Sequence, residues 1–326
     1  MREGDEAVNL LRRLLKAYSP TGREGRVAKL LLEELRARGI DAYTDEAGNV
    51  LAHKKGPGPR ILLAGHMDTV RGYIPVRRRG EELCGRGAVD AKGPLACLLF
   101  AFLEGEADMT FAGLVDEEGG SRGARALTVP RPEYVIVGEP SGWEGVAIAY
   151  RGSLTLRMRA RVERFHASSS AKGAAELLID RWLKLSEGFG PGFYRPSGRI
   201  LSFKAREGPF AYEAEMVVNV RIPPGAAMPS CGEVLEWTPP YELAPTRPLV
   251  RAFVRAIRRQ RGRPQLKKKL GTSDLNLLAA RFACEAVAYG PGDSSLDHTP
   301  HERISLQEYL RALEVLKGAL LELRRA

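Results

Sequence analysis

The stretch ILLAGHMDTV, residues 61–70, joins an apolar run to polar residues, and the rest of the chain is organised around it. Its first four residues, Ile61 to Ala64, have the length and composition of a buried β-strand. That strand would carry His66 and Asp68 to its C-terminal end, where open α/β sheets bind their ligands. Imidazole is a common metal ligand, and a nearby carboxylate can orient it. On their own, the two residues could equally form a satisfied pair without a catalytic role.

Further candidate ligands lie in GRGAVDAKG (residues 85–93) and DEEGGSRG (residues 116–123). Asp90 precedes a predicted helix, and by itself it could be simply the N-cap of that helix. Glu117 and Glu118 follow an apolar run directly. Three adjacent acids repel one another unless a cation or protons neutralise them, and this favours a cation site over a surface turn.

Glu139 extends the series to another predicted strand end. The apolar run 134–137 is followed by GEPSG, residues 138–142, which contains this glutamate. So many metal-type side chains at successive strand ends favour one common site over unrelated surface acids. The side chains in question are His66, Asp90, Glu117, Glu118 and Glu139.

The hydrophobic pattern divides the chain into two predicted domains. Residues 1–148 and 243–326 combine apolar strands with amphipathic helices, which is typical of an α/β domain. Residues 149–242 instead show alternating strands and one helix, a β-α-β-β pattern that predicts a small inserted α+β domain. Apolar and polar residues alternate over residues 146–162, so this segment is expected to form one long strand that is covered on one face.

Composition narrows the class of protein. The chain is 44% hydrophobic and 28% charged, which is typical of a soluble globular protein, and no apolar run approaches the roughly 20 residues of a membrane span. The acid-containing amphipathic start is unlike a secretory signal, and the four scattered cysteines indicate free thiols. These features predict a cytoplasmic protein. Abundant arginine with scarce asparagine and glutamine is common in heat-adapted proteins.

The net charge of +10 leaves two interpretations open. The basic residues are dispersed and lack the interleaved aromatics of a base-stacking surface, so no nucleic-acid partner is expected. The charge fits either a solvated arginine-rich surface or an acidic macromolecular partner.

Five motifs occur in a fixed order: GHMDTV, GRGAVDAKG, DEEGGSRG, GEPSG and, at residues 297–304, DHTPHERI. Together they resemble the dinuclear zinc aminoacylase family, which includes carboxypeptidase G, acetylornithine deacetylase and succinyl-diaminopimelate desuccinylase. The resemblance covers nearly the whole chain. It implies an α/β, zinc-aminopeptidase-like catalytic domain with a mixed sheet flanked by helices, and an inserted lid and dimerisation domain. It also implies hydrolysis of linear amide bonds with two divalent metal ions, zinc first, and cobalt or manganese as alternatives.

The resemblance assigns a role to each motif residue. His66 and Glu139 would bind one metal ion, and Glu118 and His298 would bind the other. Asp90 would bridge the two ions. In the same way, the remaining roles fall to Asp68, which would orient a ligand, and Glu117, which would act as the general base. His301 and Cys84 receive no role.

Two residues of the predicted inserted domain are further candidates. His166 in HASSS (residues 166–170) is similar to the family's His-x-Ser-Ser element, which implies a donor to the oxyanion, usually in the partner subunit's site; a capping or surface histidine is the alternative. Arg221 would grip a substrate carboxylate or form a structural salt bridge. The resemblance implies a homodimer formed through this domain, although residues 226–237 look too short and too broken for the family's second lid helix.

The chain has a small lid, a positive net charge and a last motif whose sequence is similar to that of one subgroup of the family. Its members release lysine or ornithine from a small acidic amino-group carrier protein by cleaving a γ-glutamyl amide, in lysine and arginine biosynthesis. A basic rim would steer such a carrier electrostatically. The alternatives are a small-molecule N-acyl-amino-acid deacylase or dipeptidase, and a non-catalytic binding protein that would have lost ligand residues.

Overall fold

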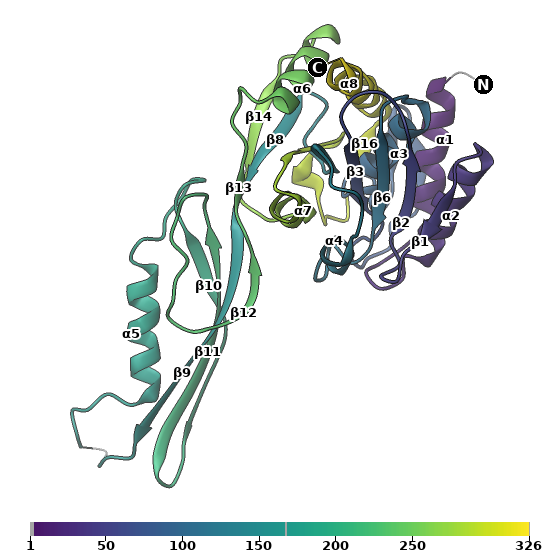
Figure 1. The fold of residues 1–326 in the computed structure, drawn as a ribbon. Helices are drawn as coiled ribbons and strands as arrows, with labels where there is room; N and C mark the ends of the chain where they lie inside the picture. Colours follow the sequence, from purple (N-terminus) through teal and green to yellow (C-terminus); the bar gives the residue numbers. More distant parts are fainter. Residues whose placement is uncertain (1–2, 167, 326) are drawn as a thin grey trace. The chain divides into compact units, whose positions relative to one another are not determined.

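The computed structural model describes residues 3–166 and 168–325, which divide into two compact units (Figure 1). The first unit comprises Met1–Ile148, Leu243–Lys267 and Ser273–Ala326. The second comprises Ala149–Glu242 and Lys268–Thr272. The last of these segments was not foreseen as part of the inserted domain, and the roles of the two domains stay predictions.

A mixed β-sheet forms the centre of the first unit. Its strands are β1 (Ala42–Thr44), β2 (Val50–Lys54), β3 (Ile61–His66), β6 (Met109–Leu114), β7 (Tyr134–Gly138), β15 (Glu285–Tyr289) and β8 (Gly145–Tyr150). They lie in the order β1-β2-β6-β3-β7-β15-β8; the same sheet continues from β8 to β13 (Tyr241–Glu242), and β14 (Gln265–Lys269) also pairs with β8. Strands β6, β3, β7 and β15 are mutually parallel, whereas β1, β2 and β8 pair antiparallel with their neighbours. The parallel strands are buried throughout or nearly so, which explains their continuous apolar sequences.

The first unit also contains helices around this sheet. They are α1 (Glu3–Lys16), α2 (Gly25–Ala37), α3 (Lys92–Glu104), α4 (Arg122–Ala126), α6 (Pro248–Arg259), α7 (Asp274–Phe282) and α8 (Leu306–Arg324), with a 3₁₀ turn η1 (Ser294–Leu296). Helix α3 is apolar almost all round because it packs on β3 and β7 and is covered by α1 and α8. Helix α6 instead buries one apolar stripe and exposes a row of arginines.

A small antiparallel sheet ties the C-terminal segment to the region before α3. It consists of β4 (Arg77–Arg79), β5 (Glu82–Cys84) and β16 (Arg303–Ser305), in the order β16-β5-β4. Arg303 lies opposite Cys84, and Ile304 lies opposite Leu83. This pairing brings the DHTPHERI motif beside the GRGAVDAKG motif, although more than 200 residues separate them in sequence.

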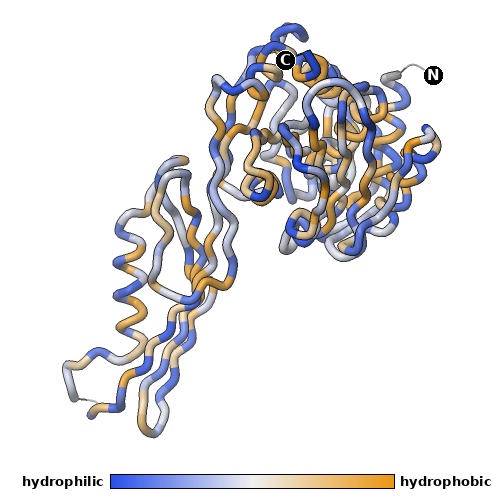
Figure 2. The backbone as a smooth tube through the Cα atoms, in the orientation of Figure 1, coloured by the Kyte–Doolittle hydropathy of each residue, from blue (hydrophilic) through white to orange (hydrophobic). Residues whose placement is uncertain are grey.

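The second unit is an antiparallel sheet with one helix. Its elements are β9 (Gly152–Glu163), α5 (Ala174–Ser186), β10 (Ser197–Glu207), β11 (Ala211–Ile222), β12 (Glu233–Thr238) and β13 (Tyr241–Glu242), and β14 (Gln265–Lys269) ends in it. The sheet order is β10-β11-β9-β12. Leu154, Leu156 and Met158 point from β9 into a core shared with α5 and β11. Their alternation with polar residues gives the banded colouring of these strands in Figure 2.

Two details differ from the sequence-based expectation. Residues 146–162 form two strands, not one: β8 is buried along its whole length, whereas β9 alternates. Arg151 interrupts them, and its buried side chain bonds to carbonyl groups of residues 192 and 193 and to Ser197. In addition, residues 233–238 form β12, an edge strand that the Gly- and Pro-broken sequence did not suggest.

Within the described ranges, 3–166 and 168–325, none of the helices is both long enough and apolar enough to pass through a bilayer.

Candidate metal centre

Parallel strands bring the predicted ligands to one edge of the first unit's sheet. His66 is the last residue of β3, and Glu139 directly follows β7. Glu117 and Glu118 lie in the turn after β6. Because these strands run parallel, their carboxyl ends meet at the same edge. The loop after β15 supplies His298, so the ligand atoms of His66, Glu118, Glu139 and His298 lie close to those of Asp90.

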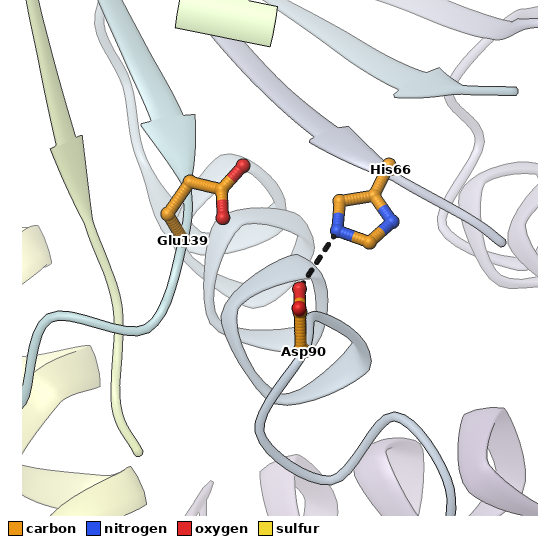
Figure 3. A group of neighbouring side chains, drawn as sticks. All are labelled: His66, Asp90 and Glu139. Atoms are coloured by element: carbon orange, nitrogen blue, oxygen red, sulfur yellow. Dashed lines mark hydrogen bonds and ion pairs between the residues drawn. The ribbon is translucent and has the colours of Figure 1, made fainter. Parts of the chain in front are cut away.

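Two groups of side chains meet closely enough to hold metal ions. In the first, the ligand atoms of His66, Asp90 and Glu139 lie within 4.8 Å of one another (Figure 3). In the second, those of Asp90, Glu118 and His298 do the same. Asp90 belongs to both: its Oδ1 is 3.2 Å from Nε2 of His66, and its Oδ2 is 3.0 Å from Nε2 of His298. One carboxylate therefore presents one oxygen to each group.

The position of Asp90 answers a question that the sequence left open. The N-cap of α3 is Ala91, and no side chain caps that helix. The carboxylate of Asp90 is turned instead toward the two histidines. Burial alone would raise the pKa of Asp90, but hydrogen bonds from His298 and His66 lower it below its usual range.

Asp68 holds the turn that carries the two glutamates. Its Oδ1 accepts a hydrogen bond from the backbone N–H of Glu117 at 3.1 Å, and its Oδ2 accepts one from the N–H of Glu118 at 3.2 Å. The hydroxyl of Thr21 donates a third at 2.8 Å. Nδ1 of His66 lies 3.0 Å from the backbone oxygen of Asp68. The predicted orienting role of Asp68 thus has a geometric basis, whereas Thr21 carried no signal in the sequence.

Glu117 lies beside both groups but belongs to neither, as far as the described residues go. Burial raises its pKa well above the ordinary value; the attraction of His66 opposes this, and the charges of Glu139 and Asp274 add to it. Glu118 differs because its Oε1 lies 3.0 Å from Nε2 of His298. The two adjacent glutamates therefore face different surroundings.

Hydrogen bonds with carboxylates raise the pKa values of the two histidines. Burial opposes protonation of His66, yet hydrogen bonds with Asp68 and Asp90 raise its pKa well above the ordinary value. The hydrogen bond with Asp90 is the largest cause that raises the pKa of His298 to about 9. His298 also has a backbone φ of 61°, a left-handed conformation that is uncommon outside glycine.

Asp274 is a buried acid near the site that the sequence analysis overlooked. It is the first residue of α7 and is 1% exposed. Burial raises its pKa to about 6, although the attraction of His66 opposes the shift. The only available signal was an acid at a helix start in GTSD, a pattern that more often marks a cap.

The donor chemistry of the site fits divalent cations. Acids outnumber imidazoles at this sheet edge: the acids are Asp68, Asp90, Glu117, Glu118, Glu139 and Asp274, and the imidazoles are His66 and His298. Such a concentration of buried negative charge is costly unless cations neutralise it. Each group also combines imidazole nitrogen with carboxylate oxygen, a donor set that suits Zn²⁺, Co²⁺ or Mn²⁺. The residues present therefore fit a pair of metal ions.

The two remaining candidates belong to the second unit. His166 is exposed, and its Nδ1 lies 2.8 Å from the hydroxyl of Ser168; the intervening Ala167 is outside the described residues. Arg221 donates from Nη1 to the hydroxyl of Thr272 at 3.2 Å. Burial lowers the pKa of Arg221, and the charges of Arg199 and Arg151 lower it further. Their catalytic and substrate-binding roles stay predictions.

The two residues left without a role lie as follows. His301 is exposed in the turn before β16. Cys84 is half-buried on β5, where it pairs with Arg303 and Arg77. Nothing in these surroundings assigns either residue a chemical task.

Comparison with known proteins gives concordant matches over most of the chain. The sequence pattern of peptidase family M20/M25/M40 matches residues 62–322. A relative from Pyrococcus furiosus, which carries the provisional name LysW-lysine/LysW-ornithine hydrolase, is 56% identical over 319 residues and 98% of each chain. A relative from Deinococcus radiodurans named LysW-lysine hydrolase is 36% identical over 355 residues and 98% of each chain. The crystal structure of aminopeptidase PepT from Bacillus cereus has a TM-score of 0.81 over 98% of each chain at 18% identity, a likeness of fold.

Proposed function

The chain belongs to peptidase family M20/M25/M40, and we propose that it hydrolyses the amide that joins lysine or ornithine to a carrier protein of the LysW type. Membership confirms the family resemblance and the α/β fold class predicted from the five motifs. It also makes the chain a hydrolase of a family whose enzymes typically use two metal ions. The observation that carries the proposal is the pair of side-chain groups sharing Asp90, with Glu117 beside them.

The choice of substrate follows from the relatives and from charge. Relatives that span almost the whole chain are named for LysW-lysine and LysW-ornithine. The net charge of +10 suits an acidic carrier, because opposite charge speeds the encounter of two proteins. The bond cleaved would be the amide between a glutamate side chain of the carrier and the α-amine of the amino acid. The products would be the free carrier and lysine or ornithine, for lysine and arginine biosynthesis in the cytoplasm.

Three acidic residues of the site would have different roles in the reaction. Glu117, a buried carboxylate outside both groups, would take a proton from the attacking water and return it to the leaving amine. Asp68 would fix the positions of Glu117 and Glu118 through the hydrogen bonds that it accepts from their backbone N–H groups. Asp90 would share its carboxylate between the two groups.

The metal ions would be held by the residues that the two groups contain. His66 and Glu139 would hold one ion, Glu118 and His298 would hold the other, and Asp90 would contact both. When bound, the ions polarise the amide carbonyl and lower the pKa of water. We infer zinc from the mixed imidazole and carboxylate donors, with cobalt or manganese as substitutes.

The second unit would serve the reaction as a lid and as the dimer contact. His166 would donate a hydrogen bond to the oxyanion, an interaction that is worth about 3 kcal/mol of barrier in other hydrolases. Arg221 would bind a substrate carboxylate. This role is supported by its half-buried side chain, which forms a hydrogen bond with Thr272 but none with a carboxylate of the described residues. Homodimerisation through this unit remains part of the proposal.

The test is direct turnover of loaded carrier. The purified protein is incubated with LysW–lysine and with LysW–ornithine in the presence of Zn²⁺ or Co²⁺, and the free amino acid is quantified. Acetyl-ornithine and a dipeptide run in parallel as the alternative substrates. Release from the carrier supports the proposal. No release from the carrier, together with turnover of either small molecule, would identify a deacylase or dipeptidase instead.

A further inference from the structure

Glu302 is a buried acid that the chemistry described above does not use. It lies four residues after His298, directly before β16, and it is 1% exposed. Its side chain turns toward the loop between β5 and α3, which carries Asp90. A buried carboxylate is costly unless its oxygens accept hydrogen bonds, so the partners of Glu302 indicate its task.

Among the residues that the structure describes, all donors of hydrogen bonds to Glu302 lie in this one loop. Its Oε1 accepts from the backbone N–H of Val89 at 2.9 Å and of Asp90 at 3.0 Å. Its Oε2 accepts from the N–H of Gly87 at 3.0 Å and from Nη1 of Arg86 at 2.9 Å. Two donors at each oxygen use the carboxylate fully, and three of the four are main-chain groups beside Asp90.

The surroundings leave this loop little freedom to move. Gly87 has a φ of 87°, and a Cβ atom there would lie 2.9 Å from the methyl group of Thr69. The N–H of Gly85 donates to the backbone oxygen of Glu302 at 3.3 Å, and the β16–β5 pairing continues the attachment. Glu302 therefore joins the chain that carries His298 to the loop that carries Asp90.

We propose that Glu302 is a positioning residue of the metal centre, which holds the shared carboxylate of Asp90 between His66 and His298. This inference rests on the proposed function, because it presupposes that the two groups bind metal ions. Glu302 belongs to neither group in the described residues, and it holds Asp90 through the backbone N–H groups of Asp90 itself, Val89 and Gly87. Removal of the Glu302 carboxylate would allow the side chain of Asp90 to move away from one group or both. We therefore expect the affinity for metal ions to fall, and substrate binding to be affected only as a consequence of that loss.

The variant Glu302→Gln isolates this effect with little change in volume. The amide keeps one acceptor oxygen but replaces the other with an NH₂ group, which then faces N–H donors of the loop. Either orientation of the amide loses two of the four hydrogen bonds. A residue that supports metal ligands in this way typically changes metal affinity by about 10- to 100-fold when it is mutated.

Glu285 offers a matched control. It is also a buried carboxylate, and it accepts a backbone hydrogen bond from Leu249 at 3.1 Å and pairs with Arg247 at 2.6 Å. It lies at the opposite end of β15 from the metal-side loop. Glu285→Gln therefore reports the cost of removing such an acid without touching the loop of Asp90.

The experiment measures metal binding in addition to activity. Metal-free wild-type protein, Glu302→Gln and Glu285→Gln are titrated with Co²⁺ by calorimetry and visible absorption, and low-temperature electron paramagnetic resonance reports magnetic coupling between the ions. We expect two coupled ions in wild type and in Glu285→Gln. In Glu302→Gln we expect at least one site weakened about tenfold or more, weaker coupling, and activity that recovers with excess Co²⁺.

The outcomes distinguish the proposed function from the positioning role of Glu302. If wild type binds no pair of ions, the proposed function fails together with this inference. If wild type binds a coupled pair and Glu302→Gln binds it with unchanged affinity and coupling, the positioning role alone is wrong. Equal weakening in Glu285→Gln also overturns it, because the effect would then be one of general stability.

Should Glu302→Gln fail to fold, the wild-type protein answers the question by amide hydrogen exchange. The N–H groups of Val89 and Asp90 have Glu302 as their acceptor, so they are expected to exchange slowly in the folded, metal-free protein. Rapid exchange of both amides in otherwise protected protein would show that Glu302 does not hold the loop.

Discussion

Replacing Glu117 by glutamine separates the proton-transfer role from metal binding. The side chain keeps its length, and the backbone N–H of residue 117 keeps its 3.1 Å hydrogen bond to Asp68, so the turn after β6 is preserved. Glu117 belongs to neither group of metal-type ligands in the described residues. The substitution therefore removes a proton acceptor and leaves the predicted ligands in place.

The expected loss can be stated from this geometry. A positioned general base contributes about 100- to 10,000-fold to a reaction rate, which corresponds to about 2.7–5.4 kcal/mol of barrier. Because the turn and the ligand groups stay intact, the loss should fall on kcat, with metal content at two ions per chain. Glu118→Gln should behave differently, because it removes one of three donors from the group that contains Asp90 and His298.

The assay combines steady-state release of lysine or ornithine with metal analysis of dialysed protein. We expect Glu117→Gln to hold two ions and to be nearly inactive, and Glu118→Gln to lose close to one ion per chain. Retention of near wild-type kcat by Glu117→Gln would refute the base assignment. Loss of metal from Glu117→Gln but not from Glu118→Gln would show that the two roles are exchanged.

Three further predictions concern the rest of the molecule. Asn49→Ala should lower the free energy of unfolding by about 2–4 kcal/mol in denaturant titrations, because the buried N–H of Val115 and C=O of Gly123 lose their partner; an unchanged midpoint would contradict this. Raising the ionic strength from about 0.01 to 0.15 M should lower kcat/KM for the loaded carrier by about tenfold and leave kcat unchanged, because salt screens the attraction between the basic enzyme and the acidic carrier. A kcat/KM that does not depend on salt would show that charge does not steer the carrier. Burial raises the pKa of the Cys284 thiol to about 11, so alkylation followed by peptide mass spectrometry should be slow at pH 9 and accelerate about tenfold per pH unit up to pH 11. A rate that is already constant at pH 9 would show that this thiol is unshifted.

Much of the site's layout could be predicted because it depends on strand ends. His66 and Glu139 each follow an apolar run, and parallel strands place their carboxyl ends at one edge of the sheet. Position along the chain was therefore enough to nominate these residues. The choice between a capping and a metal-facing role for Asp90 needed coordinates, because local sequence supports both.

What the sequence did not reveal depends on contacts between distant segments. Glu302 and Asp90 are 212 residues apart, and Asn49 holds Gly123 across 74 residues, so no local pattern marks either contact. The alternation of apolar and polar residues predicts one strand over residues 146–162, but only β9 has this alternation. Only the fold shows that β8 is covered throughout whereas β9 is covered on alternate residues.

We propose that Asp90 stands between two metal ions. Anomalous diffraction from crystals grown with Zn²⁺ or Co²⁺ tests it most directly. We expect two peaks about 3.5–4 Å apart, with Asp90 contacting both, His66 and Glu139 at one and Glu118 and His298 at the other. A single peak, a pair that Asp90 does not contact, or Glu117 among the ligands would contradict the account.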